Sequence, residues 1–174
     1  MKKSAIFLCI FFLLTPMPLA AKKLELPWTE KALKKAIAVG DKIIYAMSGT
    51  DKYGTEQKDD FCHEVKKIEG RIISYISYNM PADGSKPNIT GDHEVFFPKD
   101  GTSPYFSYMR PKIKIINKED ITVPAGTFEC TVVELKNMFG EVQKVWMINN
   151  LPGIYAKVTE ENRIYSLKEV QKKK

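Results

Sequence analysis

The chain has 174 residues, of which 44% are hydrophobic and 28% are charged, a balance typical of a folded globular domain. Its net charge is +6 at neutral pH, and the only basic cluster is the tail at 172–174. This composition excludes a disordered chain, and the scattered charge argues against nucleic acid as a partner.

The first 21 residues have the pattern of a secretory signal peptide. Two lysines precede an apolar run over 5–14, which is too short to cross a bilayer as a helix. We expect cleavage after Ala21, which lowers the net charge from +6 to +4 because two lysines and no acid are lost. Cys9 lies inside the apolar run, so we expect no lipid anchor. The remaining 22–174 segment is expected to form one β-rich domain, periplasmic or secreted and not integral to a membrane.

Residues 29–39 predict the one clear helix of the chain. Thr29 is a suitable N-cap, and Gly40 follows the last apolar residue as a C-terminal stop. Leu33 and Ile37 belong to an apolar stripe on one side, with lysines on the other. We expect this helix to pack on a sheet; the alternative is a lid over a cavity.

The rest of the chain predicts an antiparallel meander of about 9–11 strands. A long segment at 80–92, rich in Pro, Gly, Asp, Ser and Asn, is expected to be a mobile loop. Strands or strand fragments are expected at 41–48, 61–68, 71–79, 93–98, 103–109, 112–121, 127–135, 141–148, 154–159 and 163–170. The strand at 71–79 carries apolar residues on both faces, so we expect each face to be covered by a helix, a second layer or a ligand.

The stretch 121–135 (ITVPAGTFECTVVEL) predicts a β-hairpin. Apolar and polar residues alternate on both sides of the turn, and Pro124 fixes the first turn position. Gly126 accepts the positive φ with which such a turn commonly rejoins its second strand. The hairpin carries no chemistry of its own.

Three motifs of the second half, VPAGTF at 123–128, KVWM at 144–147 and LPGI at 151–154, resemble uncharacterised secreted bacterial domains. Those domains are similar to the LolA-like outer-membrane lipoprotein carrier fold. The resemblance covers 121–158 and implies a mainly β fold, a curved antiparallel half-barrel whose concave side holds acyl chains. It transfers no ligand-contacting residue, and this chain has one clear helix with which to cover the concave face.

Two cysteines remain after the expected cleavage, Cys62 and Cys130, in a compartment where thiols oxidise. A disulfide and two free thiols are both open alternatives. The strand phases favour free thiols, because Cys130 shares a face with Phe128 whereas Cys62 lies on the face opposite Phe61.

The search for catalytic motifs gives no catalytic residue, metal ligand set or cofactor site. His63 and His93 are the two histidines, and neither has the second histidine that an HExxH zinc helix needs. Cys62, His63 and Glu64 are adjacent strand residues that point to alternate faces. We therefore expect a surface strand with incidental ligands there rather than a metal or thiol site.

The leading hypothesis is a non-catalytic envelope module that binds an apolar ligand such as a lipid or lipoprotein acyl chain. Eight residues are candidates for the ligand cavity: Leu33, Ile37, Ile73, Tyr75, Phe97, Tyr105, Tyr108 and Trp146. The alternative is an envelope protein that interacts with another protein through the aromatic segment 96–109, its sheet filled by its own side chains. A metal or thiol enzyme around His63 ranks last.

Overall fold

The structure is a computed structural model that describes residues 25–50, 54–81, 83, 85–106, 108 and 110–173. The expected signal peptide lies outside the described residues, as does Met109. In chain order the elements are α1 (Glu30–Ala36), β1 (Lys42–Thr50), β2 (Glu56–Gln57), β3 (Asp60–Glu69), β4 (Ile72–Met80), β5 (Asn88–Phe96), β6 (Lys112–Val123), β7 (Gly126–Lys136), β8 (Val142–Ile148), β9 (Tyr155–Thr159) and β10 (Arg163–Gln171).

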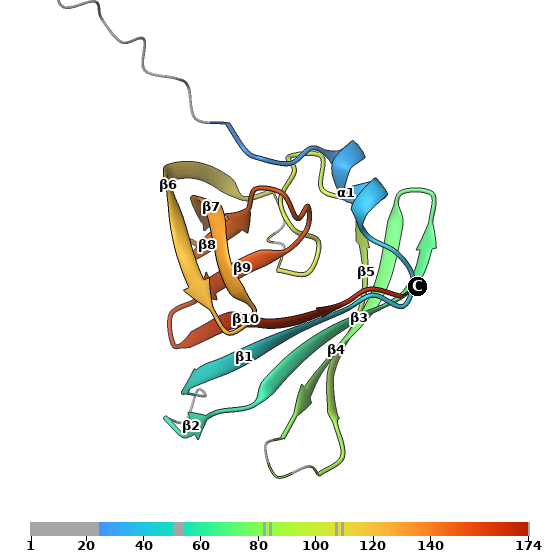
Figure 1. Ribbon diagram of the computed structural model, residues 1–174, viewed down its shortest axis with the longest axis vertical. Coiled ribbons are helices and arrows are strands. Elements are labelled where there is room, and N and C mark those ends of the chain that lie inside the picture. Colours follow the sequence, from blue (N-terminus) through green and yellow to red (C-terminus); the bar gives the residue numbers. More distant parts are fainter. Residues whose placement is uncertain are drawn as a thin grey trace, which may run out of the picture.

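All strands belong to one curved, open antiparallel sheet of ten strands, in the order β5-β4-β3-β1-β10-β9-β8-β7-β6, with β2 paired to β1. β1 lies in the middle because β10, the last strand, returns to pair with it. Figure 1 shows the sheet curling so that the half carrying β6 to β9 faces the half carrying β3 to β5. The mainly β fold class predicted from the sequence is confirmed.

The hairpin at 121–135 forms as predicted. β6 and β7 pair around the turn, with Ile121 opposite Phe128 and Val123 opposite Gly126. Gly126 has φ +135°, a backbone conformation that costs glycine little and L side chains more. The local turn chemistry therefore sets the register of the two longest strands.

Helix α1 begins where it was predicted and ends three residues early. The Thr29 side chain accepts a hydrogen bond from the Ala32 N–H at 3.2 Å, as an N-cap should. The predicted end at residue 39 is wrong, because Ile37 is already extended. Asp41 explains the early end, since its buried carboxylate accepts the Ala38 N–H at 2.9 Å. Within the described residues, no helix is long and apolar enough to cross a bilayer.

Two expectations for the middle of the chain are wrong. The expected loop at 80–92 contains the first half of β5, because its residues from Asn88 onward pair with the end of β4. The expected strand at 103–109 has no strand among its described residues. Instead, the chain between the two edge strands β5 and β6 crosses the concave face, and its residues 101–106 are buried.

The two apolar faces of β4 are buried in different clusters. Ile73 and Tyr75 join the main core between the sheet halves. On the outer face Tyr78 packs with Ile44 and Cys62 in a small separate cluster. These outer residues bury one another, so the cover that we expected from a helix, a second layer or a ligand is not needed to bury them.

Cys62 and Cys130 are free thiols, and both are buried. Cys62 is on β3 and Cys130 on β7, with four strands between them in the sheet. At about 4.8 Å per strand, the two residues are far beyond the reach of a disulfide. Burial raises the pKa of both thiols, that of Cys130 to about 12.

Candidate functional site

The crossover, defined as residues 97–111 between β5 and β6, is pinned to the concave face by buried hydrogen bonds. The Ser103 hydroxyl donates to the Gly153 carbonyl at 2.7 Å, and the Ser103 N–H donates to the Tyr155 hydroxyl at 2.9 Å. From the opposite half of the sheet, the Tyr75 hydroxyl donates to the Pro104 carbonyl at 3.2 Å. Buried backbone groups need such partners, and these bonds fix where the crossover lies.

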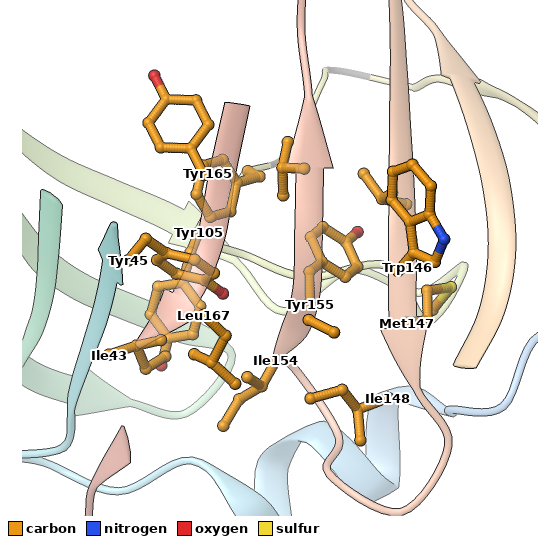
Figure 2. Close-up of a cluster of buried hydrophobic side chains, with 14 of the residues drawn as sticks. Ile43, Tyr45, Tyr105, Trp146, Met147, Ile148, Ile154, Tyr155, Tyr165 and Leu167 are labelled. Carbon is orange, nitrogen blue, oxygen red and sulfur yellow. The ribbon is translucent and has the colours of Figure 1, made fainter. Parts of the chain in front are cut away.

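The N-terminal segment closes one end of the half-barrel. The Trp28 indole stacks on Tyr155 with ring centroids 5.7 Å apart, and its N–H donates to the Ile148 carbonyl at 2.8 Å. Leu33 of α1 and Ile37, which directly follows the helix, are buried in the same core. In Figure 2 Ile148 lies beside the faint blue helix, while Tyr45, Tyr105 and Leu167 gather farther along the sheet. This end of the concave face is therefore filled by the chain's own side chains.

Beyond the crossover the concave face leaves a cavity of about 460 Å³, called here the concave cavity. Its wall combines aromatic side chains with neutral polar ones, and it has one acid and one arginine. The aromatic and other apolar residues are Met47, Phe61, Tyr75, Val95, Tyr105, Phe106, Tyr108 and Tyr165. The polar residues are Gln57, His63, Ser77, Asn79, Thr90, His93, Gln143, Glu160 and Arg163.

His63 is one of three polar side chains of this wall that are almost fully enclosed, with an exposed fraction of 2%. Its Nδ1 lies 2.9 Å from the Ser77 hydroxyl oxygen, while its Nε2 has no hydrogen-bond partner among the described residues. Its ring stacks on Tyr105 at 5.4 Å, and the rings of Phe61 and Phe106 approach at 4.8 and 4.9 Å. The expectation of a surface strand with incidental ligands is wrong for His63, although Cys62 does point to the opposite face as predicted.

Three titratable side chains of the wall are neutral at neutral pH. Burial, with a smaller contribution from His93, lowers the pKa of His63 to about 3. Burial also raises the pKa of Tyr75 to about 12 and that of Tyr105 well above its usual range. The part of the wall that these three residues form therefore presents dipoles and aromatic surface to a ligand, and the acidic and basic members of the wall are Glu160 and Arg163.

The contact between Ser77 and His63 resembles a nucleophile beside a base, but its details do not suit catalysis. A base with a conjugate-acid pKa near 3 takes a proton from a hydroxyl poorly at neutral pH. Within the part of the chain that the structure describes, no third group orients the imidazole through Nε2. Among the described residues, no three His, Cys, Asp or Glu side chains are grouped to hold a metal ion.

Seven of the eight candidate residues from the sequence fall in three places, and Trp146 is the eighth. Tyr75, Tyr105 and Tyr108 line the concave cavity. Leu33, Ile37 and Ile73 are buried in the main core and are not part of the cavity wall. Phe97, together with Tyr108, lines a second groove of about 730 Å³ at the end of β5.

Trp146 does not line the concave cavity. Alternation along β8 puts it on the face opposite Gln143, which lines the cavity. It is buried and packs within the main hydrophobic cluster. Its indole N–H donates to the Glu119 carboxylate at 2.6 Å, and Lys144 and Lys157 lie over its ring at 4.9 and 5.1 Å. The structure therefore places Trp146 in the core, with charged side chains around its ring, and outside the cavity wall.

Sequence reasoning chose none of the polar members of the wall as cavity residues, and it thus missed the three buried ones, His63, Ser77 and Gln143. A signal for His63 existed, because it alternates in phase with Phe61 and Val65 of the same strand. Gln143 likewise alternates with Val145. The sequence around His63 and Gln143 does not indicate that either residue lies beside a cavity. The cavity is formed by the crossover, which is distant from both residues in the sequence.

A scan against models of known protein families and a search of curated proteins found no match to this sequence. Among solved structures, one similar chain is from Bacteroides fragilis, assigned as exported and described as having a YmcC-like fold. It has 10% identity and a TM-score of 0.44, with 78% of this chain and 97% of that chain covered.

A second similar structure is that of a chain from Parabacteroides distasonis that is assigned as a lipoprotein. It has 13% identity and a TM-score of 0.44, with 86% of this chain and 100% of that chain covered. At these identities and TM-scores, neither likeness carries a functional argument for this chain.

Proposed function

We propose that this chain is a non-catalytic binding module of the bacterial cell envelope that holds one small ligand in the concave cavity. The main observation in support of this proposal is the cavity itself. Its volume of about 460 Å³ lies in the range of small-molecule sites, roughly 300–1,000 Å³, and it is lined by aromatic rings with a few convergent polar groups. The envelope location rests on the signal-peptide pattern of the first 21 residues.

The way the cavity is built supports binding. The crossover is held from both halves of the sheet through Ser103 and Tyr75, so the wall that it contributes is preorganised. A preformed site loses less side-chain freedom when a ligand enters than a flexible one does. The poor basicity of His63 beside Ser77 supports the non-catalytic part of the proposal.

Protein interaction through 96–109 has less support. Phe97, Tyr105 and Phe106 are buried, so these three rings cannot contact a partner without a rearrangement. Phe96 is the exposed ring among the described residues of this segment, with an exposed fraction of 68%. One exposed ring is common on the surface of a monomer.

The proposal can be tested by a substitution on the cavity wall that places a large side chain in the cavity. Thr90 is an exposed residue of β5 on the cavity wall, and Thr90→Trp should place an indole in the cavity. Asp92→Trp is the matched control, because Asp92 is exposed on the same strand and is not part of that wall. We would measure bound small molecules by native mass spectrometry of the full chain, and titrate the uncharged fluorescent probe 1-anilinonaphthalene.

We expect the wild-type chain and Asp92→Trp to bind one ligand or probe molecule per chain, and Thr90→Trp to bind at least tenfold more weakly. A wild-type chain that carries no small molecule and does not bind the probe would contradict the proposal. So would equal binding by the two tryptophan variants.

A further inference from the structure

The second groove, of about 730 Å³, is a site apart from the concave cavity. It lies where β5 ends and the crossover begins, and it shares only Val95 and Tyr108 with the wall of the concave cavity. Its volume is also in the range of small-molecule sites, roughly 300–1,000 Å³. The second groove is therefore a separate candidate for ligand binding.

Aromatic rings form much of the apolar lining of this groove. The three rings are those of Phe96, Phe97 and Tyr108. Phe97 is buried in the core and offers a ligand little surface, whereas Phe96 has an exposed fraction of 68% and Tyr108 is half-buried. The two accessible rings can pack against a flat aromatic body, face to face with an offset or edge to face.

The lining of the groove carries more positive than negative charge. It contains three cationic side chains, Arg71, Lys99 and Arg110, and one acid, Asp100. The Asp100 Oδ1 accepts two hydrogen bonds from Thr102, one from its N–H at 3.0 Å and one from its hydroxyl at 2.8 Å. The single acid of the lining is therefore held by the crossover, and no ion pair joins it to a cation of the described residues.

Two of the three cations are available to a ligand. Lys99 and Arg110 are exposed, and neither side chain makes a hydrogen bond or an ion pair with a described residue. Arg71 donates to the Glu30 carboxylate at 3.1 Å, and it does so through Nε. An anionic group in the groove can therefore pair with Lys99 and Arg110 without breaking an interaction between described residues.

Two acids near this end of β5 are not part of the groove lining, and each has partners of its own. The Glu30 Oε1 accepts from Arg71 at 3.1 Å and from Lys34 at 2.8 Å, so two cations share this carboxylate. The Glu94 Oε1 accepts from the Ser74 hydroxyl at 3.4 Å. The cations without a partner are thus those of the groove.

We infer that the second groove binds a small, flat aromatic anion, whose ring packs on Phe96 and Tyr108 and whose charged group pairs with Lys99 and Arg110. A guanidinium also stacks on flat rings, which favours an aromatic body over an acyl chain in a site with two arginines. This inference concerns a site outside the concave cavity, so it does not rest on the proposed function.

The experiment compares two fluorescent probes that differ by one negative charge, 1-anilinonaphthalene-8-sulfonate and the uncharged 1-anilinonaphthalene. It uses the full chain with Thr90→Trp, because Thr90 lines the concave cavity and not the second groove. The added indole keeps the probes out of the concave cavity. We expect this chain to bind one sulfonate probe, at least tenfold more tightly than the uncharged probe.

A matched pair of double variants tests the assignment to the groove. Lys99→Gln with Arg110→Gln removes the two cations without a partner, while Lys112→Gln with Lys118→Gln removes the same charge from exposed positions of β6 outside the lining. None of these four side chains bonds a described residue, so both variants should fold. We expect the first variant to bind the sulfonate probe at least fivefold more weakly, and the second to change its binding less than twofold.

Competition for the bound sulfonate probe tests the aromatic body. We expect naphthalene-1-sulfonate to displace the probe at a lower concentration than decanoate does. Decanoate as the better competitor would overturn the inference in favour of an acyl anion.

Three further results would overturn the inference. The first is a Thr90→Trp chain that does not bind the sulfonate probe, and the second is equal binding of the charged and uncharged probes. The third is equal weakening by the two double variants, which would show a general attraction to a basic chain. None of these results decides whether the concave cavity binds a ligand, which the titration of the wild-type chain with 1-anilinonaphthalene tests.

Discussion

His63 is held in an unusual environment for a histidine. It lies among aromatic rings, including Tyr45 at 6.2 Å and Tyr75 at 5.5 Å. The cost of burying an imidazolium there lowers the pKa to about 3. The imidazole therefore stays neutral across the pH range of most natural environments, and it remains able to either donate or accept through Nε2.

This environment predicts a pH-dependent stability. The folded-state pKa of about 3 lies below the ordinary value of 6.5, so the unfolded chain binds the extra proton between these values. Stability is fully present above about pH 6.5 and is lost as the pH falls toward 3. Between pH 7 and pH 5, we expect His63 to lower the free energy of unfolding by about 2 kcal/mol.

Urea unfolding at the two pH values measures this loss, and His63→Gln is the control. Glutamine keeps a hydrogen-bonding side chain but does not titrate, and His93 is present in both proteins. The pH dependence should therefore be smaller in the variant by about 2 kcal/mol. An equal pH dependence in the two proteins would show that His63 is protonated in the folded chain.

At the level of single residues, the sequence predicted only part of the cavity wall. Tyr75, Tyr105 and Tyr108 could be chosen because aromatic side chains in a mainly β protein are either core or ligand wall. His63 and Gln143 could not be placed, since alternation tells which face a residue occupies and not how far along that face the core ends. That boundary is set by α1 and the crossover, which are distant in sequence.

Among the elements, α1 depends on close packing against the turn between β8 and β9. Gly153 in that turn has φ +89°, and a Cβ built there would lie 2.9 Å from Ile37 Cδ1 and 3.5 Å from Leu33 Cδ2. Glycine is needed at this position for two reasons. Its backbone conformation is one that L side chains rarely adopt, and a Cβ would enter the space that Ile37 occupies. The closed end of the half-barrel relies on this contact.

Gly153→Ala should therefore destabilise the fold more than a substitution that affects the backbone alone. Gly140→Ala is the matched control, because Gly140 has φ +92° and its nearest contact, Lys136 Cε, lies at 3.9 Å. We expect about 1 kcal/mol for Gly140→Ala and roughly 1–2 kcal/mol more for Gly153→Ala, as measured by urea unfolding. Equal losses would mean that α1 is not tightly packed on the turn.

The elements that were predicted correctly are those built from local signals. The hairpin of β6 and β7 follows from Pro124 and Gly126, and the strands after it follow from alternation and short turns. The crossover was mistaken for a strand because its aromatic composition is typical of one. Its shape is set instead by hydrogen bonds from Ser103 to Gly153 and from Tyr75 to Pro104, which join residues 50 and 29 positions apart, respectively.

At the scale of the molecule, the topology explains why the cavity exists. The chain starts its sheet in the middle with β1, builds outward to β5, crosses to the far edge at β6 and returns to β1 through β10. The crossover must therefore pass over the concave face, as the yellow segment in Figure 1 does. Together with α1 it fills one end of the half-barrel and leaves the concave cavity at the other.

The central claim, that the concave cavity binds a ligand, can be tested by NMR of histidine ring nitrogens, because His63 and His93 both line the cavity. The chain contains two histidines, so a ¹⁵N-histidine-labelled sample gives two imidazole rings, which His93→Gln assigns. We predict a neutral His63 at pH 6 and a change in its Nε2 chemical shift when 1-anilinonaphthalene saturates the cavity. A probe that binds to saturation while the His63 nitrogens do not move would contradict the claim, as would a His63 that titrates near its ordinary pKa.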